Sequence, residues 1–591
     1  MYQASSCFCR FLPSEPDSPY PYYRIFFNIQ SPATGIIALI YAFKEIQKVS
    51  NHALLGDEAV ALGAMHAGLS SAYGYPGTPS TEIMEYLLRT SGSGSDEGAV
   101  HQAHWSSNEK TAFEEALGAS FCNKRVLITM KHVGLNVAAD PFMNAALLDI
   151  KGGVVLAVAD DPGMHSSQNE QDSRYFADFA MIPCLEPTSQ QEAYDMTRAA
   201  FDLSEELAVP VMIRLVTRLS HSRAAITTSE PRSQNSMNKA DGRAGWTLLP
   251  ARARKQYAAL IGKQEKMNLL SEESVFNNLK MNSSPEKSGL GIITTGLALN
   301  YFTESAGELE FSYNHLHIGQ SPWPAEKIHS LMDSSERLLI LEEGMPLLER
   351  YIRGIGTDTI PIDGKLNGKV VRQGELDPDN VREALGLPVR PALEFDTEDL
   401  PMRPPQLCRG CPHEDSYLFI KEVVESLDES VVTSDIGCYA LGVLPPLQVP
   451  ETVVCMGASI SMAKGAAEAG HPNVMAVIGD STFFHSGLTG LVDCISDRAA
   501  VTIVIVDNST VAMTGGQTTM ISSARLPEVV EGLGIEKEHL HVVDALKKAH
   551  ESNVEILRKE LAYKGPSVII SVRECVETLR KKMSEKTGGS K

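Results

Sequence analysis

The chain has 591 residues and a formal net charge of −22 at pH 7. That length allows roughly three or four domains, each long enough to bury its own core. The acidic balance, without any basic run, argues against a nucleic-acid-binding protein, because such proteins neutralise phosphates with clustered Lys and Arg. Ten scattered cysteines do not form a disulfide framework and indicate a reducing, cytoplasmic compartment.

Residues 1–52 differ from the rest of the chain because they are rich in Pro, Tyr and Phe. Their apolar run, residues 35–43, is too short to span a bilayer, and no basic segment with a cleavage site marks a signal peptide. We therefore expect a poorly ordered N-terminal extension, or a start codon assigned too early, and no membrane segment.

Residues 53–223 alternate between helical and strand patterns, which predicts an α/β fold with a doubly wound parallel sheet. The predicted strands cover residues 71–75, 126–130, 154–159 and 209–215. Polar segments follow three of these strands, at residues 75–79, 131–136 and 160–169. Because parallel strands end at one sheet edge, these segments should form a polar crevice there.

The middle of the chain carries fewer functional signals. Residues 224–288 show little periodicity and are predicted to be a connecting segment with some helix. Residues 289–400 alternate again and predict a middle α/β domain without a catalytic cluster. A proline-rich joint then opens the last domain, residues 401–580, which a charged tail, residues 581–591, follows.

The last domain contains a predicted βαβ unit, residues 473–517. Its two strands end at Asp480 and Asn508, which should meet at one sheet edge. Two hard oxygens there suit a Mg²⁺ ion that keeps most of its ligand positions for phosphate and water. Gly479 would let the backbone come close to such a ligand. The alternative is an ordinary buried βαβ unit in which Asp480 and Asn508 cap helices.

Four cysteines of this domain form a second candidate site. Cys408 and Cys411 make a C-x₂-C pair, and Cys438 and Cys575 each follow a predicted strand. Four such thiols can ligate a 4Fe–4S cluster. The alternatives are a zinc ion or unligated thiols. Core packing is the better interpretation of the cysteines in apolar segments, namely Cys122, Cys184, Cys455 and Cys494.

One known family is similar to this chain over about residues 53–580. The pyrimidine-binding domain of the indolepyruvate ferredoxin oxidoreductase α subunit, a thiamine diphosphate (TPP) enzyme, resembles YPGTPSTE (75–82), WSSNEKTAFEEALGAS with TMKHVGLNVAADP, and ADDPGMHSSQNEQDSR (159–174). Its pyrophosphate-binding domain resembles DIGCYALG (435–442), MGASIS (456–461) and GDSTFFHSGLTGL. The resemblance implies several doubly wound domains of the TPP-enzyme type, the middle one like the transketolase C-terminal domain.

The resemblance also implies a cofactor site. Asp480, Asn508 and the backbone carbonyl of Thr510 would hold Mg²⁺ against the TPP diphosphate. The family's usual residue at position 481 is Gly, so Ser481 is a small departure. The other residues expected at the cofactor are Gly479, Ser481, Gly457 and Ser459. The four-cysteine arrangement is similar to the cluster beside TPP in β subunits of 2-oxoacid:ferredoxin oxidoreductases.

Glu109 is the catalytic candidate by the same resemblance, because a glutamate at this place hydrogen-bonds N1′ of the TPP pyrimidine ring and promotes loss of the C2 proton. Alternatively, Glu109 only interacts favourably with the positive end of the dipole of its helix. Thr78 would receive the carboxylate or oxo group of the substrate, or else cap the helix that begins near Ser80. Five further residues could line the substrate side or simply stabilise loops: Lys131, His132, Asn136, His165 and Arg174.

The implied reaction is oxidative decarboxylation of an arylpyruvate such as indolepyruvate to its acyl-CoA, with electrons passed to ferredoxin. The implied assembly is a hetero-oligomer that contains a dimer of this chain and a smaller β-type subunit. The family's usual ferredoxin-like domain, with two C-x₂-C-x₂-C-x₃-C-P runs, is not found after Cys575. We therefore expect electrons to leave through a cluster-bearing partner. The alternatives are a non-redox TPP decarboxylase or carboligase, and a TPP-binding subunit without activity of its own.

Overall fold

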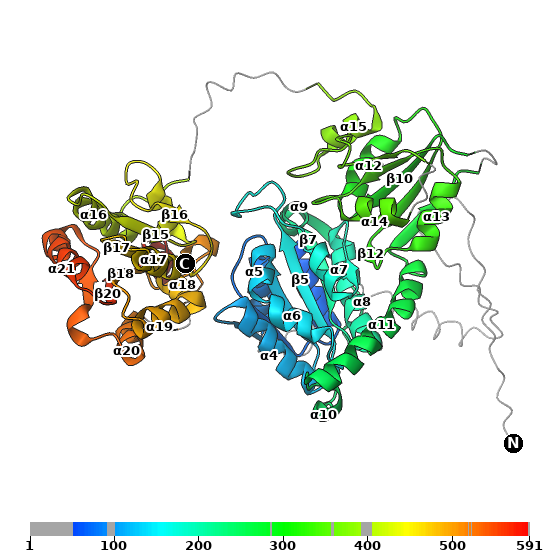
Figure 1. Ribbon diagram of the computed structural model, residues 1–591. Helices are drawn as coiled ribbons and strands as arrows, with labels where there is room; N and C mark the ends of the chain where they lie inside the picture. The colour runs from blue at the N-terminus through cyan, green and yellow to red at the C-terminus, as the bar shows by residue number, and fades with distance from the viewer. Residues whose placement is uncertain are drawn as a thin grey trace.

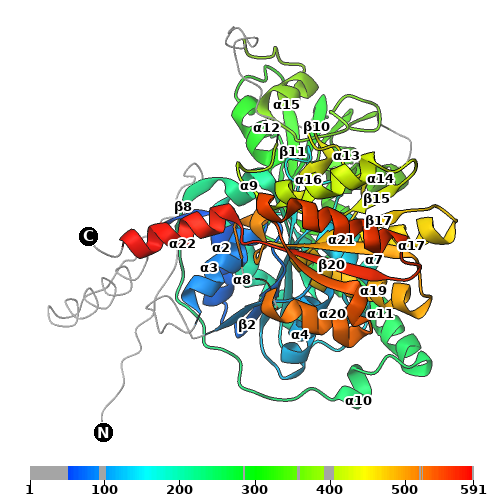
Figure 2. The same ribbon diagram turned by 90° about the vertical axis from the view of Figure 1, so that its left-hand side faces the viewer.

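The computed structural model describes residues 51–91, 101–283, 287–355, 360–391, 405–517, 519, 521 and 523–588. Nearly all of the predicted N-terminal extension, and most of the proline-rich joint, therefore lie outside the described residues. The described chain builds three sheets of five to seven strands and one small two-stranded sheet (Figures 1 and 2). None of the described helices combines the length and the apolar character needed to cross a membrane.

The first large sheet has seven strands in the order β12-β6-β7-β5-β4-β2-β3. Every neighbouring pair is parallel except β12 with β6. Its elements are β2 (Ser71–Gly74), α3 (Thr81–Thr90), β3 (Gln102–Trp105), α4 (Glu109–Phe121), β4 (Val126–Lys131), α5 (His132–Val137), α6 (Ala139–Ala145), β5 (Val154–Asp160), α7 (Arg174–Ala180), β6 (Cys184–Leu185), α8 (Gln190–Leu207), β7 (Val211–Val216) and α9 (Thr217–His221), preceded by α2 (Gly56–His66).

Two hydrophobic cores cover the two faces of this sheet. Alternate residues of β4 and β5 enter different cores, as Val155 and Ala157 pack with α2 and α8 while Val154 and Leu156 pack with α4 and α6. Strands buried on both faces are continuous apolar runs, which is why the sequence showed them clearly. The predicted doubly wound α/β fold is confirmed.

The segment after this sheet is more regular than the sequence suggested. Strand β8 (Arg223–Thr227) pairs antiparallel with β1 (Asn51–Leu55). After the short α10 (Gly242–Gly245), α11 (Pro250–Glu272) runs for 23 residues. It buries Leu260 and Met267 in the core beside α4. Its few apolar positions are too widely spaced to give a strong helical signal.

The middle sheet has five strands in the order β14-β13-β10-β11-β9, all parallel except β9. Its core is continuous with the first domain, because Leu290, Ile292 and Leu339 belong to the same cluster as α2 and α8. The elements are β9 (Asn277–Lys280), β10 (Leu290–Thr295), α12 (Ala298–Ala306), β11 (Tyr313–Ile318), α13 (Ala325–Asp333), β13 (Leu338–Leu341), α14 (Leu347–Ile355), β14 (Ile362–Asp363) and α15 (Pro378–Leu385). Between β11 and α13, the chain returns to the first sheet as its edge strand β12 (Gln320–Ser321).

The last sheet has six parallel strands in the order β16-β15-β17-β18-β20-β19. Its strands and α-helices are α16 (Pro412–Glu425), β15 (Val431–Ser434), β16 (Thr452–Val453), α17 (Ala458–Glu468), β17 (Val474–Gly479), α18 (Asp480–Thr482), α19 (Leu488–Ser496), β18 (Val501–Asp507), α20 (Leu526–Leu533), β19 (Leu540–Asp544), α21 (His550–Ala562), β20 (Ser567–Val572) and α22 (Val576–Gly588). Its 3₁₀ and π turns are η1 (Cys438–Val443), η2 (Phe483–Gly487), η3 (Ala512–Thr514), η4 (Ser523–Arg525), η5 (Lys537–His539) and η6 (Lys547–Ala549). The expected βαβ unit is present as β17, α19 and β18.

Candidate active site between two sheets

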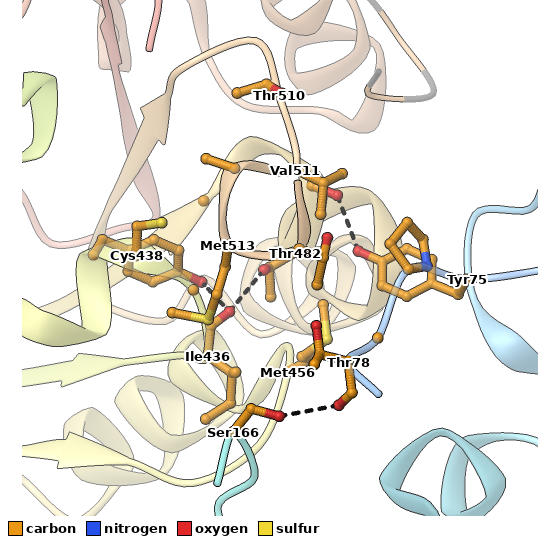
Figure 3. A pocket seen from close by; sticks show the side chains of 18 of the residues that line it. Tyr75, Thr78, Ser166, Ile436, Cys438, Met456, Thr482, Thr510, Val511 and Met513 are labelled. Carbon is orange, nitrogen blue, oxygen red and sulfur yellow. Dashed lines mark hydrogen bonds between the residues drawn. The ribbon is translucent and has the colours of Figure 1, made fainter. Parts of the chain in front are cut away.

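A cavity of 390 Å³ lies between the first and the last sheet. Its walls come from the segments that follow the carboxyl ends of β2, β4 and β5 on one side and of β15, β17 and β18 on the other. Figure 3 shows side chains of both groups around it, with Tyr75 and Thr78 from the first domain and Cys438 and Thr510 from the last. In α/β sheets, ligands usually bind at the carboxyl ends of the strands. Here two sheets have this edge at the same cavity.

Hydrogen bonds across the cavity join the two domains. The hydroxyls of Tyr75 and Ser481 lie 2.9 Å apart. Asn108 donates from Nδ2 to the backbone oxygen of His485 at 2.9 Å. Nε2 of His485 lies 2.8 Å from Oε2 of Glu109. Partners so distant in sequence bring residues of both domains into one site.

Glu109 stands at the start of α4 and is buried at the cavity wall. The helix begins there because Asn108 caps it, with Oδ1 accepting from the backbone N–H of Thr111 at 2.8 Å. The same Asn108 side chain contacts the last domain through its Nδ2. Asn108 therefore fixes both the start of α4 and the distance between α4 and the last domain.

Asp480 and Asn508 line the opposite side of the cavity, as do Gly479, Ser481 and Thr510. Oδ2 of Asp480 is buried and has no hydrogen-bond partner among the described residues. Burial and the neighbouring carboxylate of Asp507 raise the pKa of Asp480 well above its usual value. A divalent cation would relieve both effects, because it supplies the missing ligand and the missing positive charge. The residues present therefore fit Mg²⁺ and the diphosphate that it would hold.

His413 is a residue of this site that sequence reasoning missed. Its Nε2 lies 3.1 Å from Nδ2 of Asn508. Burial and nearby Arg573 lower the pKa of His413 to about 4, so the ring is neutral and accepts a hydrogen bond from the Asn508 amide. Because Nδ2 of Asn508 contacts His413, Oδ1 is the side-chain atom of Asn508 that can bind a metal ion. The sequence signal was the position of His413 two residues after Cys411 of the C-x₂-C pair.

Thr78, Lys131 and His165 line the first-domain side of the cavity. Ser80, not Thr78, is the N-cap residue of α3, so the alternative role considered for Thr78 is not seen. The backbone oxygen of Thr78 accepts from the Ser166 hydroxyl at 3.1 Å (Figure 3). Burial lowers the pKa of Lys131 to about 8. His165 is more exposed and lies 3.1 Å from a carboxylate oxygen of Glu375.

Three residues expected near the substrate lie away from the cavity lining. His132 is buried with Nε2 3.2 Å from the backbone oxygen of Asn169, and Asn136 is exposed on α5. Arg174 is fully buried and pairs with Asp172 at 2.6 Å and Glu342 at 3.1 Å. That network ties the first domain to the middle domain, which gives Arg174 a structural position.

Two residues expected at the cofactor also lie behind the wall. The Ser459 backbone N–H and hydroxyl both donate to the Asp435 carboxylate, the former at 2.8 Å. Gly457 has a φ of +87°, and a Cβ at this position would lie 2.5 Å from the Cβ of Ser486. Both residues therefore shape the turn that begins α17, and Met456 is the residue of this turn that lines the cavity.

A second cavity, of 300 Å³, lies next to the first and is lined by all four predicted ligand cysteines. Cys438, His413, Asn508 and Ala512 line both cavities. Burial raises the pKa of Cys411 to about 11 and that of Cys438 to about 12. Among the described residues, no three His, Cys, Asp or Glu side chains are grouped as a site for a single metal ion.

Two family models match the segments of the chain that border the cavity. The model described as "Thiamine pyrophosphate enzyme, C-terminal TPP binding domain" matches residues 435–571. The model described as "Pyruvate flavodoxin/ferredoxin oxidoreductase, thiamine diP-bdg" matches residues 62–268. These two segments contain Asp480 and Asn508 on one side of the cavity and Glu109 on the other.

Curated relatives cover most of the chain. Indolepyruvate oxidoreductase subunit IorA of Archaeoglobus fulgidus is 36% identical over 559 residues, which are 88% of this chain and 86% of the relative. The chain belongs to the indolepyruvate oxidoreductase subunit IorA family. Further IorA relatives come from Methanothermobacter thermautotrophicus, 35% identical over 88% of this chain and 86% of the relative, and Thermococcus kodakarensis, 36% identical over 88% and 85%.

Membership of the IorA family decides the class of enzyme. The chain is a TPP-dependent oxidoreductase of the 2-oxoacid:ferredoxin oxidoreductase type, with a TPP-binding domain at its C-terminal end. The resemblance carried by the sequence motifs and the enzyme class drawn from it are confirmed.

Proposed function

We propose that this chain is the TPP-bearing subunit of an oxidoreductase that converts an arylpyruvate such as indolepyruvate to its acyl-CoA. The observation that carries this proposal is the identity of 34–36% to IorA relatives over 88% of the chain. Coenzyme A is the acyl acceptor, and a ferredoxin or another cluster-bearing partner takes the electrons. A smaller β-type subunit completes a hetero-oligomer that contains two copies of this chain.

The cofactor lies across the cavity between the first and last sheets. Thiamine diphosphate supplies a carbon nucleophile that adds to the oxo group and an electron sink for loss of CO₂. Asp480, Asn508 and the Thr510 carbonyl hold Mg²⁺, while Gly479 and Ser481 border the diphosphate. Glu109 holds the proton at the pyrimidine nitrogen from the opposite wall. The unpartnered Oδ2 of Asp480 supports the metal role.

The substrate enters beside Thr78, Lys131 and His165. The ammonium group of Lys131 attracts the substrate carboxylate, and its burial strengthens that attraction because little water screens it. Apolar residues of the last domain that line the cavity, Ile436, Met456 and Met513, suit an aryl side chain (Figure 3). Thioethers make favourable contacts with aromatic rings. An arylpyruvate therefore matches both the charged and the apolar walls.

A 4Fe–4S cluster occupies the second cavity and is ligated by Cys408, Cys411, Cys438 and Cys575. All four thiols line one cavity, and their number matches the four ligands that such a cluster needs. The 300 Å³ of this cavity gives room for an inorganic core. Cys438 lines both cavities, which puts the electron acceptor next to the reacting cofactor.

The experiment that tests this function is anaerobic purification of the chain with its smaller subunit, followed by iron and TPP quantitation and assays of several 2-oxoacids. We expect about four irons and one TPP per chain. We also expect reduction of ferredoxin or a viologen dye that depends on both indolepyruvate and coenzyme A. TPP without iron, and product without dye reduction, would indicate a non-redox decarboxylase. Bound TPP without turnover of any 2-oxoacid would indicate a silent subunit.

A further inference from the structure

We infer that His485 is the positioning residue that sets the Glu109 carboxylate for its contact with the cofactor pyrimidine. The inference deepens the proposed function and rests on the role proposed there for Glu109. His485 belongs to the last domain and Glu109 to the first, 376 residues apart in sequence. The contact between them therefore joins the two domains at the cavity.

The backbone at His485 is unusual. After β17, the chain makes the short helix α18 and then the π-helical turn Phe483–Gly487 before α19 begins. A π-turn inserts extra backbone into a helix and changes the direction of the side chains after it, and such turns often occur at functional sites. Phe483 and Phe484 pack into the hydrophobic core of this domain. The next residue, His485, contacts the first domain instead.

Both ring nitrogens of His485 have a hydrogen-bond partner. Nε2 lies 2.8 Å from Oε2 of Glu109, and Nδ1 lies 2.6 Å from the Ser486 hydroxyl. With its proton on Nε2, the ring donates to the carboxylate and accepts from Ser486. The Tyr75 ring packs edge-on at 4.7 Å, and the side chain of His485 is only 1% exposed. The ring therefore has one orientation that satisfies its neighbours.

The carboxyl group of Glu109 is confined on a second side by Gly134 of α5. A Cβ at position 134 would lie 2.5 Å from Oε1 and 2.9 Å from Cδ of Glu109. Only a glycine allows the α5 backbone to approach this closely. Glu109 thus sits between the His485 ring and a bare stretch of backbone, and its rotamer is fixed from both directions.

This arrangement explains how a first-domain carboxylate is aligned with a cofactor held mainly by the last domain. The π-turn begins three residues after Asp480, so His485 moves with the metal-binding strand end. His485 holds one oxygen of Glu109 by a hydrogen bond. This bond fixes the position of the carboxylate relative to the cofactor site. A group held within a few tenths of an ångström is more effective than a freely rotating one.

The test uses a readout that needs neither substrate nor turnover: exchange of the TPP C2 proton for deuterium, measured by NMR after rapid acid quench of the complete subunit complex with TPP and Mg²⁺. We expect His485→Leu to slow this exchange about ten- to a hundredfold, while the Kd for TPP from calorimetry changes far less. His485→Gln, which keeps a donor near Nε2, should exchange faster than His485→Asn. His550→Leu removes another His–Glu pair, the exposed one with Glu422, in which neither residue lines the cavity, and should leave exchange unchanged.

A double-mutant cycle separates positioning from a general structural effect. In a Glu109→Gln background, His485→Leu should cause no further loss, because the group that it positions is already gone. Equal slowing in both backgrounds, or wild-type exchange in His485→Leu, would overturn the inference. Should His485→Leu not fold, the order of His485→Gln and His485→Asn decides, and exchange that is no faster in His485→Gln contradicts it. If Glu109→Gln itself exchanges at the wild-type rate, the proposed role of Glu109 fails first.

Discussion

The carboxamide nitrogen of Asn508 lies 3.1 Å from Nε2 of His413. The two residues come from the end of β18 and the start of α16, and His413 also lines the four-cysteine cavity. Because the pKa of His413 is lowered to about 4 by burial, its ring is a neutral acceptor at physiological pH. One hydrogen bond therefore links the proposed metal ligand to the proposed cluster site.

We predict that His413→Leu weakens the Mg²⁺-dependent binding of TPP about ten- to a hundredfold, which is the usual effect of losing a residue that orients a metal ligand. Titration calorimetry at several Mg²⁺ concentrations measures this change. His471→Leu is the control, because His471 is half-buried in the same domain, lies 2.8 Å through Nδ1 from the backbone oxygen of Pro472, and lines neither cavity. Unchanged Mg²⁺ dependence in His413→Leu would show that Asn508 needs no such orientation.

Glu109→Gln should lower the turnover of any 2-oxoacid by at least about a hundredfold, since general acid–base groups contribute that much or more. The substitution keeps the size of the side chain and removes its ability to hold and release a proton. TPP affinity should change much less than turnover. Steady-state assays and calorimetry on the same preparation measure both quantities, and retained turnover would remove Glu109 from its proposed role.

Substrate binding should depend on pH through Lys131. Its pKa is lowered to about 8 by burial, so the side chain is charged below that pH and neutral above it. We expect the KM for the 2-oxoacid to rise as the pH increases through about 8. Lys131→Met should have a higher KM that does not change over this range, and Lys131→Arg should stay charged and flat. A wild-type KM that is constant from pH 7 to 9 would contradict the role of Lys131.

Iron content should depend on the four cysteines that line the second cavity. Cys438→Ser should lower the bound iron to well below about four per chain and weaken the broad visible absorption of a cluster. Cys455→Ser is a matched control. The sequence predicted that Cys455 packs in the core, but it is exposed in the same domain and does not line that cavity. Equal iron in both variants would place any cluster elsewhere.

The buried position of Arg174 predicts a stability effect rather than a substrate effect. Arg174→Met leaves Asp172 and Glu342 buried with too little positive charge, and we expect it to lower the free energy of unfolding by about 3–5 kcal/mol. Arg232→Met removes an exposed ion pair with Asp202 and should cost less than about 1 kcal/mol. Urea unfolding compares the two. A KM increase in Arg174→Met without any loss of stability would restore its role in substrate binding.

The regular part of the fold could be predicted from the sequence, because strands buried on both faces of a parallel sheet have continuous apolar sequences. Examples are β4, β5, β17 and β18. Strand β3 gave no such signal because two of its four residues, Gln102 and His104, are exposed. Helix α11 was underestimated because it buries few side chains.

The site was only partly readable, for a physical reason. Residues at or just after the end of a strand, such as Thr78, Lys131 and Asp480, are placed by the strand itself and do line the cavity. The roles of His413 and His485 come from contacts with residues 95 and 376 positions away in sequence. A local sequence pattern therefore cannot predict them. His485 nevertheless stood inside a quoted motif, GDSTFFHSGLTGL, and a buried polar residue among two Phe was a usable signal.

The most direct test of the account is a crystal structure of the complete subunit complex with TPP and Mg²⁺. We predict that the metal contacts Asp480 and Asn508, and that the pyrimidine ring reaches the Glu109 carboxylate across the 390 Å³ cavity. Density for the cofactor at any other place, or a pyrimidine ring that Glu109 does not touch, would contradict the account.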